Sequence, residues 1–203
     1  MEIAVYVMPI SRSLTSEEKE QLTKELPFFR RQRFLREREE KQEQTLCAYG
    51  LLRRVLELEY GFPHLPEVEV EEGGKPCFPA CPEICFNISH TEGAVLCAIH
   101  DHSVGADIQC HRKPAASLMK AFALEAEQDF WELWVRREAI GKCRGKGFAA
   151  LRRWDEKLEE GMTCLMLETF RGYSAAVATE TAEKTCRCHI LTLEDILSTG
   201  NAE

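Results

Sequence analysis

Two apolar, β-rich runs, residues 84–89 and 94–99, lie on either side of the polar segment Ser89-His90-Thr91-Glu92-Gly93. This pattern predicts two strands that pair as a hairpin around a polar loop. A hairpin of this kind commits the middle of the chain to antiparallel β-structure, so the fold must contain at least one such sheet.

The rest of the chain alternates between helical and β-type segments. Residues 42–60 repeat apolar side chains at helical spacing, and Gly61-Phe62-Pro63 ends that helix. Thr15-Ser16-Glu17-Glu18 indicates a helix start, because Thr or Ser caps a glutamate-rich first turn. The other predicted segments are strands at 2–8, 68–70 and 104–108, helices within 115–143, and strands at 163–170, 173–179 and 186–192.

Each half of the chain thus contains helices and about three strands. We predict an α+β protein with two similar lobes: an N-terminal α+β lobe over residues 1–102 and a C-terminal α+β lobe over 103–203. The two halves share no repeated sequence, so internal symmetry does not follow from the letters alone.

Composition and charge narrow the function classes. The 203 residues carry a formal charge of −8, which disfavours nonspecific nucleic-acid binding. The N-terminus lacks the basic leader and long apolar run of a signal peptide, and no stretch has the length of a membrane span. A cytoplasmic protein is expected. Residues 30–38 are a local exception, with five arginines against one glutamate: either a solvated helix face or a site for a phosphate or an acidic partner protein.

Ten cysteines are many for this length, and in a cytosolic protein they should be reduced thiols. Cys77, Cys81 and Cys85 recur every four residues, and Cys186, Cys188 and His189 cluster near the end. Zinc is possible on ligand type, but neither set has a paired C-x-x-C spacing. Core or incidental thiols are the default interpretation.

Three charged residues are candidates for a catalytic or metal-binding site. Asp107 follows a glycine within an apolar run, and Glu138 and Lys142 are four residues apart. On a helix, that spacing places Glu138 and Lys142 on one face. Two acidic side chains from separate segments can share Mg²⁺, and a nearby lysine suits a phosphate. Taken alone, Asp107 could be an ordinary turn carboxylate and the other two a surface ion pair.

Four segments in order strengthen this interpretation: Gly74-Lys75-Pro76, Phe86-Asn87-Ile88-Ser89-His90, Gly105-Ala106-Asp107-Ile108-Gln109, and Trp134-x-x-Arg137-Glu138-Ala139-x-x-Lys142 followed by Gly145-Lys146-Gly147. In this order they resemble the 4'-phosphopantetheinyl transferases of the surfactin-synthetase-activating type. The resemblance covers roughly residues 30–180.

The resemblance implies a reaction. The enzyme would move the phosphopantetheine arm of coenzyme A onto a serine of an acyl- or peptidyl-carrier protein, with release of 3',5'-ADP. It implies a requirement for Mg²⁺ and two pseudo-symmetric α+β lobes with coenzyme A in the cleft between them. A monomer is expected, since two lobes of one chain can complete one site.

The resemblance also implies roles for individual residues. Asp107 and Glu138 would hold the metal, and Glu138 would also take the serine proton. Lys142 would neutralise charge on the phosphate, and His90 would donate a hydrogen bond to it. Four further residues would bind the nucleotide end: Ser89, Lys75 and Arg30 at its distal phosphate, and Thr45 near the adenine.

The chain departs from the family pattern at two positions. Gln109 stands where many members have a second acid, so a water or its amide would fill that metal position with weaker affinity. Arg137 replaces the usual lysine before the metal glutamate. Two other classes stay open: a degenerate member that binds coenzyme A or a carrier without turnover, and a zinc-dependent regulatory or structural protein.

Overall fold

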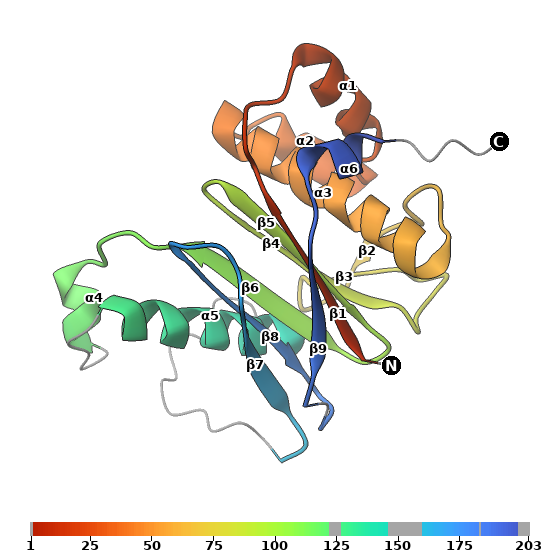
Figure 1. Cartoon of the computed structure of the whole chain (residues 1–203). Helices are drawn as coiled ribbons and strands as arrows, with labels where there is room; N and C mark the ends of the chain where they lie inside the picture. The colour runs from red at the N-terminus through yellow and green to blue at the C-terminus, as the bar shows by residue number, and fades with distance from the viewer. Residues whose placement is uncertain (1, 122–126, 146–159, 183, 199–203) are drawn as a thin grey trace.

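The computed structural model describes residues 2–121, 127–145, 160–182 and 184–198, which form two main sheets with helices on their outer faces (Figure 1). The first sheet has the strand order β4-β5-β1-β9, and the second has the order β6-β8-β7. The strand bounds are β1 Ile3–Pro9, β2 Glu69–Val70, β3 Pro76–Cys77, β4 Cys85–Thr91, β5 Ala94–His100, β6 Val104–Cys110, β7 Thr163–Leu167, β8 Tyr173–Thr179 and β9 Cys186–Ile190. The helices are α1 Ser16–Lys24, α2 Phe28–Phe34, α3 Glu39–Tyr60, α4 Ala116–Ala121, α5 Glu127–Cys143 and α6 Leu193–Leu197.

Strand β1 lies at the centre of the molecule and is buried on both faces. Its odd-numbered residues Ile3, Val5 and Val7 pack toward the second sheet, while Tyr6 and Met8 belong to the core under α3. Side chains alternate between the two faces of a strand, so a strand with two covered faces has an almost continuous apolar sequence. The layers therefore follow the order helices, first sheet, second sheet, helix α5.

Helix α5 packs on the far face of the second sheet, where Val135, Ala139 and Cys143 meet β8. Gly105 of β6 permits this close approach. A Cβ atom at Gly105 would overlap the carbonyl oxygen of Ala139 and the backbone nitrogen of Cys143. The helix backbone thus rests directly on the strand, which brings the polar face of α5 to the edge of β6.

The predicted local signals at helix ends are confirmed. Thr15 caps α1 in a capping box with Glu18, and α3 ends at Gly61, whose φ of 72° is left-handed. The predicted hairpin is β4 paired antiparallel with β5. No helix in the described ranges has both the length and the hydropathy needed to cross a membrane.

The mixed α+β architecture agrees with the prediction, and one strand differs from the expected arrangement. Strand β9 follows the second sheet in sequence but lies beside β1 (Figure 1). The two strands pair parallel, with Tyr6 opposite His189. Helix α6 then packs on α3 in the same layer. Strand pairing is nonlocal, so local patterns do not specify it. A domain division at residues 102 and 103, and pseudo-symmetry between lobes, stay predictions.

Candidate active site

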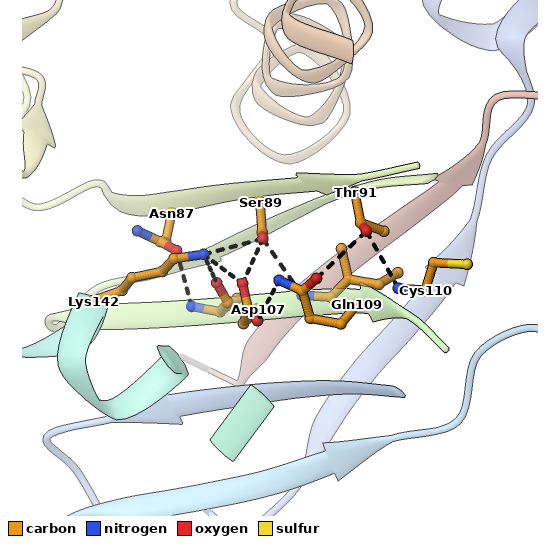
Figure 2. A network of polar contacts seen from close by, with 9 residues as sticks. Asn87, Ser89, Thr91, Asp107, Gln109, Cys110 and Lys142 are labelled. Carbon is orange, nitrogen blue, oxygen red and sulfur yellow. Dashed lines mark hydrogen bonds and ion pairs between the residues drawn. The ribbon is translucent and has the colours of Figure 1, made fainter. Parts of the chain in front are cut away.

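A row of polar side chains joins the two sheets where β4 runs beside β6 (Figure 2). Three alternate residues of β4 each accept a hydrogen bond from a backbone N–H of β6: Ala106 N donates to Asn87 Oδ1 at 2.9 Å, Ile108 N to Ser89 Oγ at 3.4 Å, and Cys110 N to Thr91 Oγ1 at 3.3 Å. Strand β6 pairs with β8 along its other edge. The side chains therefore satisfy an edge that would otherwise be unpaired.

Asp107 is the buried centre of this junction. Its side chain is 3% exposed, and its Oδ1 atom lies 2.7 Å from Lys142 Nζ and accepts a hydrogen bond from Ser89 Oγ at 2.8 Å. Lys142 reaches it from α5 and also donates to the backbone oxygen of Ala106 at 3.1 Å. A buried carboxylate requires a paired charge and hydrogen bonds, and this one has both.

Ser89 links the cation to the carboxylate. Its hydroxyl donates to Asp107 and accepts from Lys142 Nζ at 3.0 Å and from the N–H of Ile108. One hydroxyl has one proton and two lone pairs, so these three contacts use its full capacity. In this arrangement Ser89 orients Asp107, and its predicted contact with a nucleotide phosphate stays a prediction.

Glu138 lies one helical turn before Lys142 on α5, as its spacing predicted. Burial raises the pKa of its carboxyl group, the nearby Asp107 carboxylate raises it further, and Lys142 opposes the effect. Within the described ranges, its carboxylate has no hydrogen bond or ion pair. Two neighbouring carboxylates that repel each other, with one free of hydrogen bonds, form a donor set that fits Mg²⁺.

Gln109 contacts the same carboxylate with its amide nitrogen. Its Nε2 atom donates to Asp107 Oδ2 at 3.3 Å, and Thr91 Oγ1 donates to its Oε1 atom at 3.5 Å. A carboxylate only accepts hydrogen bonds, so the NH₂ group is the end that must face Asp107. The predicted role of Gln109 as a metal ligand stays a prediction, and in this structure its amide supports Asp107.

His90 faces the opposite side of β4 from Ser89 and lines a second region, which we call the basic pocket. This pocket of about 200 Å³ is lined by Arg30, Arg33, Lys41, Thr45, Ala48, Tyr49, Ile88 and His90. Burial lowers the pKa of His90 to about 4, and the charges of Lys142, Lys41 and Arg30 add to the effect. His90 is therefore neutral at pH 7 and bonds through Nδ1 to Gln44 Oε1 at 3.1 Å.

Arg30 and Thr45 meet within the basic pocket, whereas Lys75 does not join them. Arg30 Nη2 donates to Thr45 Oγ1 at 2.9 Å. Lys75 Nζ instead donates to Ser103 Oγ at 2.6 Å and to the backbone oxygen of Cys143 at 3.0 Å. It lines a separate pocket of about 410 Å³ that shares no residue with the basic pocket. Its predicted contact with the same phosphate stays a prediction.

The cysteines form no metal-binding group in the described ranges, and all ten are free thiols. The one His, Cys, Asp and Glu cluster found there is His100, Asp101 and His102, at the turn between β5 and β6. His100 Nδ1 accepts the backbone N–H of His102, so in the neutral ring Nε2 carries the proton and faces Asp101 Oδ1 at 3.3 Å.

Three residues of these sites were given no role by sequence reasoning. Asn87 and Thr91 flank Ser89 at intervals of two, which is a readable strand signal once β4 is known to border β6. Glu37 is the single acid within the basic segment 30–38, and its contact with Arg30 could not be read from spacing. Lys146 and Gly147, part of the last family motif, lie outside the described residues.

Comparison with known proteins gives a consistent set of relatives. The chain is 28% identical to the 4'-phosphopantetheinyl transferase Sfp of Bacillus subtilis (strain 168) over 160 residues, which is 71% of each protein. It is 30% identical to the 4'-phosphopantetheinyl transferase psf-1 of Bacillus pumilus over 186 residues, which is 77% of this chain and 79% of that protein.

A shorter match extends the same set. The chain is 35% identical to the 4'-phosphopantetheinyl transferase AcpT of Salmonella typhi over 114 residues, 48% of this chain and 59% of the relative. No protein-family model matches the chain.

Proposed function

This chain belongs to the 4'-phosphopantetheinyl transferases, and from that premise we propose that it converts an apo carrier protein to its holo form. It takes the phosphopantetheine arm from coenzyme A, attaches it to a serine of an acyl- or peptidyl-carrier protein, and releases 3',5'-ADP. The observation that carries the proposal is the cluster of Asp107, Lys142 and Ser89 beside the Glu138 carboxylate.

The transfer needs an acceptor for the serine proton. The serine oxygen forms a bond to the phosphorus that bears the pantetheine arm, the bond from that phosphorus to the ADP oxygen breaks, and Glu138 takes the serine proton. Burial and the Asp107 carboxylate raise the pKa of the Glu138 carboxyl group, so without a bound cation it takes up a proton more readily than an exposed glutamate does. Lys142 Nζ neutralises the charge that develops on the phosphate oxygens.

Positioning accounts for most of the catalysis of phosphoryl-type transfer, and the two sheets supply it. Ser89 and Gln109 orient Asp107, and the backbone of β6 is fixed to β4 by the polar row. Asp107 and Glu138 would hold Mg²⁺, whose charge would offset the pyrophosphate and polarise the reacting phosphorus.

The basic pocket is the proposed site for the nucleotide end of coenzyme A. Arg30, Arg33 and Lys41 supply positive charge for its distal phosphate, and Thr45 lies beside them. Neutral His90 lines this pocket and has one ring N–H, which Nδ1 donates to Gln44 Oε1, so it would have to exchange that partner for a phosphate oxygen to donate to the ligand. Carriers of fatty-acid, polyketide or nonribosomal-peptide synthesis fit this chemistry equally. The proposal includes a monomeric protein in the cytoplasm.

Intact-protein mass spectrometry tests the proposal directly. Purified apo carrier proteins of the three kinds are incubated with the protein, coenzyme A and Mg²⁺, and we expect a mass gain of one phosphopantetheine. Chelation with EDTA and the Glu138→Ala substitution should abolish the gain. Asp129→Ala, an exposed acid on the same helix, serves as the matched control and should leave it intact.

A negative result in this assay would support the alternative function. A protein that binds coenzyme A but modifies none of the three carriers would be the non-catalytic binder, and the transferase mechanism would be rejected.

A further inference from the structure

Glu37 is a nearly buried acid held by cations of the basic pocket. It lies in the turn between α2 and α3, and its side chain is 7% exposed. Arg30 Nη2 donates to both of its carboxylate oxygens at 2.9 Å, and Thr45 Oγ1 donates to Oε2 at 3.2 Å. Arg33 Nε lies 3.6 Å from Oε1. The carboxylate therefore engages the donors that a phosphate in this pocket would need.

The pocket is otherwise cationic. Arg30, Arg33 and Lys41 line it together with His90, and no Asp or Glu is among the residues that line it. Arg30 also has spare capacity, because its Nη1 atom is buried and has no hydrogen-bond partner within the described part of the chain. A guanidinium presents its donors as a planar fork that fits two oxygens of a carboxylate or a phosphate. Here one arm of the fork is occupied by Glu37 and the other is unused.

We propose that Glu37 is a built-in counter-anion that competes with the nucleotide phosphate for Arg30, Arg33 and Thr45, and so sets the affinity for coenzyme A. This inference rests on the proposed function. A phosphate can begin to bind through the unused Nη1 atom, but to gain Nη2 and Thr45 Oγ1 as donors it must displace the carboxylate, so part of its binding free energy is used to break the existing pair. Because Glu37 lies in a turn and not inside a helix, it can swing outward without unwinding α2 or α3.

If Glu37 has a positioning role instead, its removal should change the affinity for the nucleotide in the opposite direction. If Glu37 only held Arg30 ready for the ligand, its removal would leave Arg30 less ordered and weaken binding. If it competes, its removal strengthens binding. The sign of the change in affinity therefore separates competition from preorganisation.

Isothermal titration of the full chain with 3',5'-ADP measures this sign. We expect Glu37→Gln to lower the Kd by about three- to tenfold, the range of a modest electrostatic gain. Glu40→Gln removes the same charge from an exposed neighbouring position and should change the Kd by less than about twofold. An unchanged or higher Kd for Glu37→Gln overturns the proposal.

Titration with a second nucleotide shows which phosphate the gain in affinity depends on. The gain should be lost with 5'-AMP, which lacks one of the two phosphates, because the competition is for a single phosphate position. An equal gain with both nucleotides would assign the effect to general charge and overturn the proposal. Circular dichroism checks that Glu37→Gln is folded. If it is not, Glu37→Asp withdraws the carboxylate by one methylene and should still lower the Kd.

Different results overturn the proposed function and the role of Glu37. A wild-type protein that binds neither nucleotide overturns the proposed function and this inference together. A wild-type protein that binds 3',5'-ADP, with no gain in either Glu37 variant, overturns this inference alone.

Discussion

Lys142 on α5 places its Nζ atom 2.7 Å from Oδ1 of Asp107 on β6, so the cation of one element is held by the carboxylate of another. Helix α5 and strand β6 thus meet at a charged contact in the same place where Gly105 lets their backbones touch.

Replacing Lys142 by glutamine should slow transfer by about 100-fold or more, since it removes charge stabilisation from the phosphate. It should also lower the free energy of unfolding by roughly 2–3 kcal/mol, because Asp107 stays buried without its counter-ion. The rate of holo-carrier formation and urea unfolding measure the two effects. Lys120→Gln, an exposed lysine on α4, should change neither. A Lys142 variant with near wild-type turnover would remove this residue from the mechanism.

Gly105→Ala should reduce both stability and turnover. The added methyl would push α5 away from β6, at a cost of about 1–3 kcal/mol in the free energy of unfolding, and would shift Lys142 from Asp107. Gly61→Ala is the contrast: its left-handed φ of 72° costs about 1 kcal/mol, but nothing lies within 4 Å of the new atom. Both variants should lose stability, and only Gly105→Ala should lose turnover. Equal turnover in both would show that α5 can shift without affecting the site.

The lowered pKa of His90 gives a pH dependence with a definite sign. Between its ordinary pKa of 6.5 and about 4, the unfolded chain binds a proton at this ring while the folded protein does not. Stability should therefore fall as pH drops through this window. His90→Gln should remove that part of the decline, as measured by urea unfolding at intervals from pH 7 to pH 4. Parallel curves for the two proteins would mean that His90 titrates normally.

Gln109→Glu should increase the affinity for Mg²⁺, because a carboxylate binds this ion more strongly than an amide does. Titration calorimetry with Mg²⁺ in the presence of 3',5'-ADP measures the affinity, and the Mg²⁺ dependence of transfer provides a second readout. Without Mg²⁺ the variant should be less stable than wild type, since the new charge lies beside Asp107. An unchanged Mg²⁺ dependence would place Gln109 outside the metal site.

The parts of the molecule that local patterns predict well are those with a local physical cause. Helix α3 has an amphipathic repeat and a glycine stop, and α1 has its Thr15 capping box. The four-residue spacing of Glu138 and Lys142 placed both on one helix face, as the structure has them. Helix α2 has no side-chain cap and is mostly basic, so the sequence predicts only a solvated helix face or an anion site over residues 30–38 and does not fix where the helix begins or ends.

The parts that were not predicted depend on contacts between distant segments. The predicted contact of Ser89 with a phosphate comes from the family resemblance, and only the position of β6 reveals that its hydroxyl is fully used by Asp107, Lys142 and Ile108 in this structure. Glu37 belongs to a basic run in which one acid appears incidental. Its contact with Arg30 becomes evident only in the folded chain, where α2 brings Arg30 to Thr45.

The parallel pairing of β1 with β9 also has a consequence for how the protein is made on the ribosome. Strand β1 precedes the other described strands in the chain, yet the neighbour that covers its second edge, β9, follows the strands of both sheets. Until then β1 is an edge strand whose residues are almost all apolar, the kind of surface through which chains join edge to edge. The nascent chain must therefore carry this apolar strand with one edge uncovered until β9 has been synthesised.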